Sequence, residues 1–183
     1  MATATTTLPA AGTWTFDKAH TQIGFAARHL MVTKVRGHVA EFDGTVTVAD
    51  RPEKSHAEVV MQAASITTGT IDRDNHLRSP DFFDVANFPT LRFKSTKIER
   101  NGDKWKLSGG LTIKNLTKPV TLDVSYEGIA NDPWGKEHVA FSATVEVNTE
   151  DWGLTWNVAL ETGGWLVSKK ATIEIEGQLV KTG

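Results

Sequence analysis

Apolar and polar side chains alternate along most of this chain, and a period of two residues is typical of a β-strand with differently exposed faces. In the segment 105–113, Trp105, Leu107, Leu111 and Ile113 are separated mostly by lysine, serine and threonine. The pattern returns in residues 120–126, 139–147 and 171–179, and over shorter stretches in residues 23–25, 46–48 and 91–93. Such alternation indicates antiparallel strands with one face in a core and the other in water, because parallel strands bury both faces. The predicted fold class is therefore all-β.

The pattern predicts about eight strands, and a sheet of that size with one apolar face must close on itself or split into two packed layers. Several strands look long, and consecutive strands look joined by hairpins. Asn101-Gly102, for example, suits a tight turn because both positions tolerate positive φ. These features favour an up-and-down barrel over the long crossovers of a Greek-key sandwich. We expect an eight-stranded antiparallel barrel, with the sandwich as the alternative.

Two stretches break the alternation. Residues 29–35 contain few turn-forming residues and have the wrong spacing for a strand, so we expect a short helical turn that leads into a strand from Arg36. Residues 68–93 form an insertion rich in charges and aromatics. Within it Ser79 resembles an N-cap, with Pro80 at the first helical position, so we expect a short helix to begin there. In an antiparallel protein such long connections often carry the binding site.

Composition limits the class of protein. The chain has 183 residues, 39% of them apolar, which suffices for one domain with a sizeable core. Its formal net charge of −2 and its lack of a Lys/Arg run argue against a nucleic-acid partner. Because cysteine is absent, disulfides, thiolate metal sites and thiol catalysis are excluded.

The first residues differ in composition from the rest. Residues 1–12 are rich in Thr and Ala and lack both a basic start and a hydrophobic run, so we expect a flexible tail and no signal peptide. Residues 13–183 are expected to form a single domain. No apolar stretch approaches the ~20 residues of a membrane-spanning helix, so the protein is predicted not to span a membrane and to be cytoplasmic.

Several motifs together resemble the YceI-like polyisoprenoid-binding family. They are D-K-A-H-T-Q-I-G-F (17–25), H-L-M-V-T-K-V-R-G (29–37), R-D-N-H-L-R-S-P-D-F-F-D (73–84), D-P-W-G-K (132–136) and D-W-G-L-T-W-N (151–157). The resemblance implies an extended lipocalin-like barrel whose apolar interior holds a long lipid, such as a polyisoprenoid, an isoprenoid quinone, or a fatty acid or amide. The chain departs from the family pattern at Thr149, where an Arg is usual, and at Lys169-Lys170, where an acidic pair is usual.

Large apolar side chains predicted to face inward are candidates for lining a lipid tunnel, and they would equally serve to fill a solid core. The two alternatives differ only in whether space remains, since eight strands enclose room for one small ligand or for a filling of side chains. The candidates are Ile23, Phe25, Phe42, Phe93, Leu111, Ile113, Phe141, Trp156 and Trp165.

Cationic side chains near the two irregular stretches are candidates for binding a polar lipid head, since guanidinium groups suit phosphate. The candidates are Arg28, His29, Arg73, His76 and Arg78. The alternative is a local structural role, in which the arginines pair with Asp72, Asp74 and Asp81 to fix the insertion.

Other functions have weaker support in the sequence. The even spacing of His20, His29 and His38 matches no metal-ligand pattern, and no nucleophile elbow, P-loop or dinucleotide fingerprint is present. We therefore predict no catalytic residue, no metal and no cofactor besides a bound lipid. An acid–base pair such as Asp17 with His20 keeps an enzyme acting on an isoprenoid or quinone intermediate as an alternative, beside a ligand-free structural or stress-related module. A homodimer is expected by analogy with the family.

Overall fold

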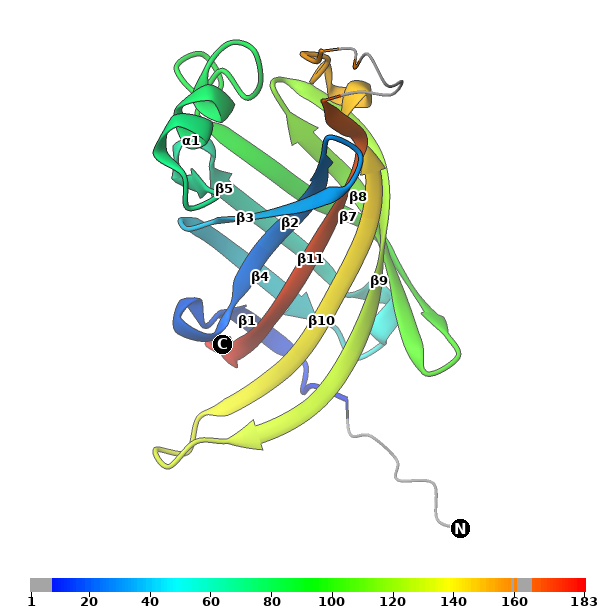
Figure 1. Ribbon diagram of the computed structural model, residues 1–183. Helices are drawn as coiled ribbons and strands as arrows, with labels where there is room; N and C mark the ends of the chain where they lie inside the picture. The colour runs from blue at the N-terminus through cyan, green and yellow to red at the C-terminus, as the bar shows by residue number, and fades with distance from the viewer. Residues whose placement is uncertain (1–7, 159, 161–165) are drawn as a thin grey trace.

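Long antiparallel strands wind round a common axis in the computed structural model, which describes residues 8–158, 160 and 166–183 (Figure 1). The strands are β1 (Gly12–Phe16), β2 (Gln22–His29), β3 (Thr33–Val39), β4 (Phe42–Val48), β5 (His56–Gln62), β6 (Ile66–Thr67), β7 (Thr90–Asn101), β8 (Lys104–Ile113), β9 (Leu116–Asn131), β10 (Glu137–Asn148) and β11 (Val167–Lys181). One α-helix, α1 (Ile71–Arg78), and four 3-10 turns, η1 (Lys18–His20), η2 (Pro52–Lys54), η3 (Ala63–Ser65) and η4 (Thr149–Trp152), complete the described part of the chain.

The sheet closes into a barrel. Its strands follow the order β1-β4-β5-β7-β8-β9-β10-β11, and the ring is completed where β11 pairs with β1 through Phe16 and Leu179. Strands β2, β3 and β6 continue the sheet from the same β11. Every pairing is antiparallel, so the predicted eight-stranded antiparallel barrel is confirmed and the sandwich alternative is wrong.

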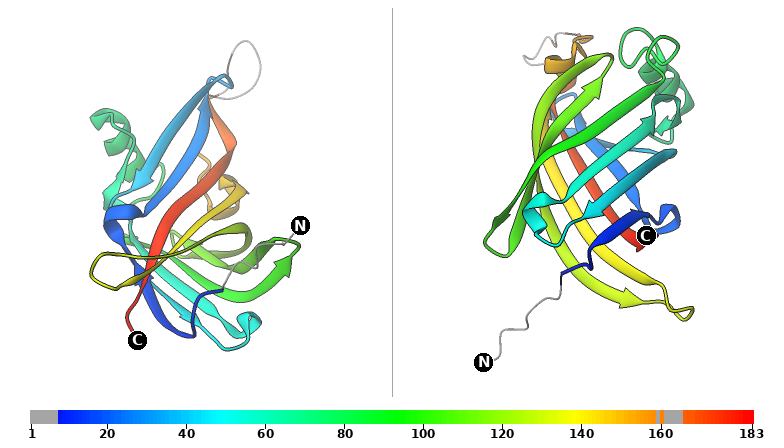
Figure 2. Two further views of the ribbon diagram at one scale, coloured as in Figure 1. Left: turned by 90° about the horizontal axis from the view of Figure 1, so that it is seen from below. Right: turned by 180° about the vertical axis from the view of Figure 1, so that it is seen from behind.

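Three of the eight barrel strands are each interrupted by a bend. Strand β11 pairs first with β2, down to Glu176 opposite Gln22, and then with β1, so β1 and β2 act as two halves of one strand that η1 divides. Strands β3 and β4 are likewise separated by two residues, and β5 and β6 by η3. These bends let the upper half of the sheet lean away from the lower half (Figure 2).

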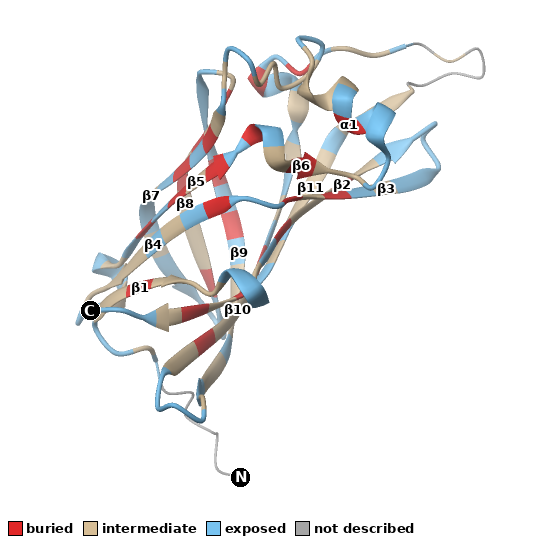
Figure 3. Cartoon of the chain, turned by 90° about the vertical axis from the view of Figure 1, so that its left-hand side faces the viewer, coloured by how far each residue is buried: buried red, intermediate tan, exposed pale blue. Residues whose placement is uncertain are grey.

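The apolar faces of the strands point into the barrel, as the alternation predicts. Buried and exposed positions follow one another along the strands (Figure 3). Two tryptophans anchor opposite ends of this interior. Trp14 is 0% exposed and its indole N–H donates to the Ala10 carbonyl at 3.0 Å, while buried Trp152 donates to the Leu111 carbonyl at 2.8 Å. Both indoles thus satisfy their polar group inside an apolar environment.

Successive connections alternate between the two ends of the barrel. The upper end in Figure 1 carries the β2–β3 turn, the insertion with α1, the β8–β9 turn, η4 and the start of β11. The lower end carries the β4–β5, β7–β8 and β9–β10 connections, together with β1 and the end of β11. No helix in the described ranges has the length and apolar character needed to cross a membrane.

The short helix of the insertion lies earlier than the sequence suggests. Helix α1 begins after Thr70 and ends before Ser79, which is its C-cap with extended backbone (φ −74°, ψ 168°). The expectation that Ser79 starts a helix is wrong. The ring of Pro80 disfavours helical backbone at the preceding residue, so Ser79 ends the helix, and the residues after it form turns.

The turn after β2 is a hairpin turn. Strand β2 continues to His29 and β3 starts at Thr33, opposite it. Leu30 and Met31 between them have positive φ angles of 55° and 64°. The expected helical turn over residues 29–35 is therefore wrong. Pairing of the flanking strands forces a left-handed backbone on two apolar residues that rarely adopt it.

Candidate functional site

The barrel interior contains a cavity of about 460 Å³. Small-molecule sites typically measure roughly 300–1,000 Å³. Its wall is mainly apolar and draws on the inward faces of the strands and on the insertion. Side chains that line it include Phe16, Val46, Val59, Met61, Val120, Leu122, Val124, Val139, Ala143, Val145, Val147, Ile173, Ile175 and Leu179. The interior is therefore hollow and apolar, which the alternation alone could not distinguish from a filled core.

Glycines on neighbouring strands make room for aromatic rings against the barrel wall. A Cβ at Gly44 would overlap the ring of Phe16, and one at Gly109 would stand 2.7 Å from Cζ of Phe93. Gly37 stands in the same relation to Phe25. Each ring lies where the neighbouring side chain would be. The aromatic side chains thus cover the backbone without plugging the interior.

Six of the nine predicted tunnel residues line this cavity: Ile23, Phe25, Phe93, Leu111, Ile113 and Phe141. Phe42 is buried but is not among the lining residues. It packs edge-to-face against Phe16, with ring centroids 5.9 Å apart, and Phe16 faces the cavity. Trp156 lies outside the wall, at the upper end, and Trp165 lies outside the described residues. That any of these residues contacts a ligand stays a prediction.

Part of the wall is absent from the predicted lining residues. The valines and isoleucines of β9, β10 and β11 lie on the predicted apolar strand faces but are not among the predicted tunnel residues. Leu77, Phe82 and Phe83 of the insertion also reach the cavity. Alternation could have identified the strand residues, whereas an insertion without regular period gives no such signal.

A buried aspartate holds the insertion against the barrel. Asp74 of α1 is only 6% exposed, and its carboxylate accepts hydrogen bonds from the Thr68 amide at 2.7 Å, the Thr68 hydroxyl at 2.6 Å and the Thr67 hydroxyl at 3.0 Å. Burial alone raises the pKa of this carboxyl, but the hydrogen bonds from Thr68 and Thr67 outweigh it, so the pKa is lowered. Asp74 is therefore a charged anchor for the segment that precedes α1.

The two arginines of α1 serve the same segment. Arg73 donates to the Thr68 hydroxyl at 2.7 Å and to the Thr68 carbonyl at 3.1 Å. Arg78 donates to the carbonyls of Ala64 at 2.9 Å and Ile66 at 3.1 Å. The expected local role thus agrees with these contacts, although the partners are hydroxyl and carbonyl oxygens where aspartates were expected.

An aromatic cluster joins the insertion to the segment that follows η4. The His76 ring packs edge-to-face on Trp156, with centroids 4.5 Å apart, and on Phe82 at 5.0 Å, while Phe82 and Trp156 lie 5.4 Å apart. Nε2 of His76 is hydrogen-bonded to Asp81 at 2.8 Å. Because Phe82 also lines the cavity, this cluster covers part of the cavity's upper end.

The five predicted head-group residues form two groups at the upper end. Arg73, His76 and Arg78 belong to α1, whereas Arg28 and His29 are exposed at the end of β2. None of the five is among the residues that line the cavity in the described structure. Two residues that differ from the family pattern, Thr149 and Lys169, are in contact. The Thr149 hydroxyl, on the cavity wall, donates a hydrogen bond to the Lys169 carbonyl at 3.0 Å.

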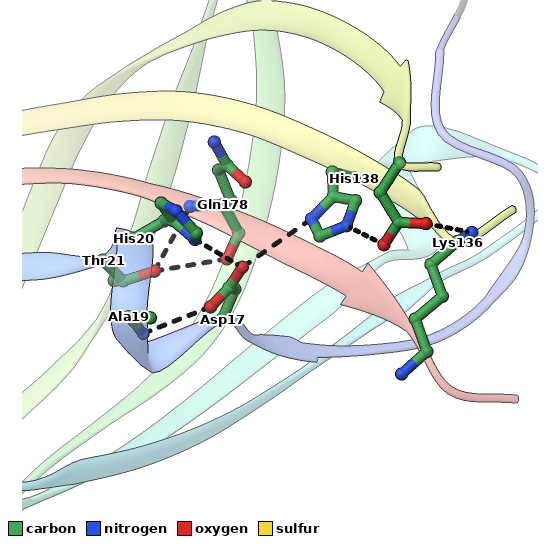
Figure 4. A network of polar contacts seen from close by, with 8 residues as sticks. Asp17, Ala19, His20, Thr21, Lys136, His138 and Gln178 are labelled. Atoms are coloured by element: carbon green, nitrogen blue, oxygen red, sulfur yellow. Dashed lines mark hydrogen bonds and ion pairs between the residues drawn. The ribbon is translucent and has the colours of Figure 1, made fainter. Parts of the chain in front are cut away.

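A chain of ionisable side chains ties the lower end together (Figure 4). His138 of β10 lies 2.9 Å from Asp132, measured from Nε2, and 3.7 Å from Asp17, measured from Nδ1, while His20 is hydrogen-bonded to Asp17 at 2.8 Å. Hydrogen bonding from His138 lowers the pKa of Asp132. For Asp17, burial raises the pKa, but His20, the Ala19 amide and His138 together outweigh burial, so the pKa is lowered.

The four side chains of Asp17, His20, Asp132 and His138 form a structural clamp. It joins the η1 corner to β10 and to the β9–β10 turn, and neither Asp17 nor His20 lines the cavity, so the suspected acid–base pair does not face the apolar chamber. Across the described ranges, no cluster of three or more His, Asp and Glu side chains is arranged to hold a metal ion.

A closed antiparallel barrel of eight strands with an apolar internal cavity defines a class of hollow β-barrels, which includes small-ligand carriers. Within that class, the chain belongs to the family of the YceI-like domain, whose model matches residues 14–179.

Individual relatives agree with this assignment. A UPF0312 protein from Yersinia pestis (strain Pestoides F) is 34% identical over 163 residues, covering 88% of this chain and 83% of that protein. The crystal structure of a Campylobacter jejuni YCEI protein superposes with a TM-score of 0.73 at 29% identity, covering 91% of this chain and 96% of the other. A polyisoprenoid binding domain from Saccharophagus degradans, at 10% identity, shares the fold with a TM-score of 0.70 over 92% of this chain and 98% of that one.

Proposed function

We propose that this protein binds a long apolar lipid in the barrel cavity and carries or stores it without chemical change. The observation that supports this proposal most strongly is the apolar cavity of about 460 Å³. Moving apolar surface from water into such a wall is favourable by ~25 cal/mol per Å². A hydrocarbon chain is therefore the kind of molecule that the cavity would bind.

The shape of the wall supports a chain-like ligand. Residues from both ends of the barrel border the cavity, from Leu8, Pro9 and His56 at the lower end to Leu77, Phe83 and Val167 at the upper end. Polar lining residues lie toward the two ends of the cavity, with Asp50, Ser55 and His56 at the lower end and Thr149 and Ser168 at the upper end. This distribution suits a ligand with a long apolar tail. The Saccharophagus domain, named for polyisoprenoid binding, supports a polyprenyl chain as the ligand class, and an isoprenoid quinone or a fatty acid would present the same kind of apolar tail to the cavity.

Organic extraction of the purified protein followed by mass spectrometry tests this proposal. We expect a stoichiometric lipid whose mass is unchanged after prolonged incubation, because a carrier performs no turnover. Clean extracts from several expression hosts, together with no binding of added polyprenol, quinone or fatty acid, would contradict the proposal. A product of altered mass would support the enzyme alternative.

A pair of variants on one strand locates the binding. Ala143 of β10 lines the cavity, whereas Ala140 is on the other face of the same strand. We expect Ala143→Phe to fill part of the chamber and lower lipid occupancy at least about tenfold, and Ala140→Phe to leave it unchanged. Thermal unfolding of both variants shows whether lost occupancy reflects filling or misfolding. Equal occupancy in both would place the lipid elsewhere.

A further inference from the structure

Exposed large apolar side chains are concentrated at one end of the barrel. Eight are exposed in the described structure, and two of these, Leu8 and Trp134, lie at the lower end. The other six lie on upper-end connections: Leu30, Met31, Val32, Ile71, Leu116 and Val158. Three of the six are consecutive in the β2–β3 turn, where Val32 is 70% exposed. An apolar tip of this kind is typical of a surface that meets another molecule.

The β2–β3 turn retains apolar residues where its backbone disfavours them. Leu30 and Met31 both have positive φ, a conformation that Asn and Gly tolerate far better. The other described residues with positive φ are Gly, Asn or Asp, except Lys114, which precedes Asn115 in the β8–β9 turn. Strained backbone conformations are concentrated at functional sites. Leu30 and Met31 are apolar residues at two positions where Asn or Gly would be less strained, which points to a function of the apolar side chains themselves.

Cations flank the apolar tip. Residues 28–36 contain Arg28, Lys34 and Arg36 and no carboxylate, in a chain of net charge −2. Arg36 is paired with Glu174 at 3.4 Å, and Arg28 donates to the Val32 carbonyl at 3.1 Å, which holds its guanidinium beside the tip. Lys114 and Lys118 similarly flank exposed Leu116, the first residue of β9 after the β8–β9 turn. Apolar tips bordered by Lys and Arg have the chemistry of surfaces that bind anionic bilayers.

We propose that the upper end docks on an anionic lipid bilayer, with Leu30, Met31 and Val32 entering the boundary between headgroups and acyl chains. Arg28 and Lys34 then face the lipid phosphates. The cavity wall reaches Ala27 and Ser168, next to this turn, and Ser168 accepts a hydrogen bond from the Arg28 amide at 3.1 Å. A docked barrel thus brings its chamber close to the membrane. The use of docking for lipid exchange depends on the proposed function, whereas docking itself does not.

Charge favours a bilayer over a second copy of the chain. A two-fold contact between identical tips would bring the same cations together. Anionic headgroups complement these cations, and the apolar tip matches the bilayer interior.

Vesicle flotation tests the proposal. We expect the protein to float with vesicles of phosphatidylcholine and phosphatidylglycerol, and to bind pure phosphatidylcholine vesicles about tenfold or more weakly. The informative variant is Leu30→Asn with Met31→Gly, which removes the apolar tip and gives the turn its preferred residues. We expect at least about tenfold weaker vesicle binding together with an equal or higher midpoint of thermal unfolding.

Matched variants separate the surface from general stickiness. Trp134→Ser removes an apolar side chain, 86% exposed, from the lower end and should leave vesicle binding unchanged. Lys34→Ser should weaken binding, whereas Lys136→Ser in the β9–β10 connection should not. Wild-type protein that fails to bind anionic vesicles, or a Leu30→Asn/Met31→Gly variant that binds them like wild type, would overturn the proposal. So would conversion of a dimer to a monomer by that variant without any vesicle binding, which would make the tip a contact between copies.

The two proposals can fail separately. The Leu30→Asn/Met31→Gly variant, loaded with lipid in detergent, should retain wild-type lipid stoichiometry, and Ala143→Phe should retain vesicle binding. If the Leu30→Asn/Met31→Gly variant loses its lipid while the wild-type protein binds anionic vesicles, the result would count against the assignment of the lipid to the cavity and not against membrane docking.

Discussion

The ring of Phe16 lies directly over Gly44 on the neighbouring strand, in the place where a side chain at residue 44 would extend. We predict that Gly44→Ala lowers the free energy of unfolding by about 1–3 kcal/mol, because the ring must move into the cavity or the strands must separate. Chemical unfolding in urea measures this. Gly24→Ala is a milder control, since its Cβ would stand 3.3 Å or more from its nearest neighbours.

A double-mutant cycle identifies the ring as the cause. Combining Gly44→Ala with Phe16→Leu should cost less than the sum of the two single changes, because the shorter side chain vacates the site. Additive costs would show that the ring and the glycine are not coupled.

Asp74 should be the most sensitive carboxylate of the insertion. Asp74→Ala removes the acceptor of three hydrogen bonds from Thr67 and Thr68, so we expect a loss of about 1.5–3 kcal/mol in the free energy of unfolding. Asp72→Ala, on the same helix but exposed, should cost less than about 0.5 kcal/mol. Urea unfolding distinguishes the two. Equal costs would mean that Asp74 does not anchor the segment.

The clamp at the lower end should weaken in acid. The pKa values of Asp17 and Asp132 are lowered in the folded protein, so their stabilisation is present above the unfolded value of 3.8 and is lost as pH falls through the folded values. We expect the free energy of unfolding to fall with pH below about 5. Asp132→Asn should flatten this dependence, and Asp103→Asn in the exposed β7–β8 turn should not. Identical acid slopes for wild type and Asp132→Asn would contradict the clamp.

The aromatic cluster should control how firmly the insertion is closed over the cavity. Trp156→Ala removes contacts with His76 and Phe82, each worth about 0.5–1.5 kcal/mol beyond area burial. We expect faster amide hydrogen exchange in residues 71–88, with exchange in β9 and β10 unchanged. Trp134→Ala, in an exposed turn, should leave hydrogen exchange in residues 71–88 unchanged. Unaltered exchange in the insertion of the Trp156 variant would rule out the cluster as its fastening.

The barrel could be predicted from the sequence because burial on one face imposes the period of two directly on the residues. Ile23, Phe25, Phe93, Leu111, Ile113 and Phe141 were placed inward by that period and do line the cavity. Phe42 obeys the same period, yet it packs against Phe16 and is not among the residues that line the cavity. Alternation shows which face of a strand is buried, but it does not show which buried side chains border an empty space.

The irregular segments were harder because their conformation depends on partners elsewhere. The pairing of β2 with β3 imposes positive φ on Leu30 and Met31 against their local preference. Ser79 has an N-cap side chain, but Pro80 fixes it as the end of α1. Arg73 and Arg78 are suitable phosphate ligands by residue type. In the structure their guanidinium groups instead bind oxygens of residues 64–70, and these tertiary contacts cannot be predicted from the local sequence.

Strand β11 follows the other described barrel strands in the sequence, and it completes the ring on both sides, with β10 along one edge and β1 and β2 along the other. During synthesis, the earlier strands leave the ribosome as an open sheet with two unpaired edges while this segment is still inside the exit tunnel. Unpaired edges invite association with other chains. Closure must therefore wait until residues 167–181 have been made and released, and nascent chains halted before residue 167 should be the form that aggregates or recruits chaperones.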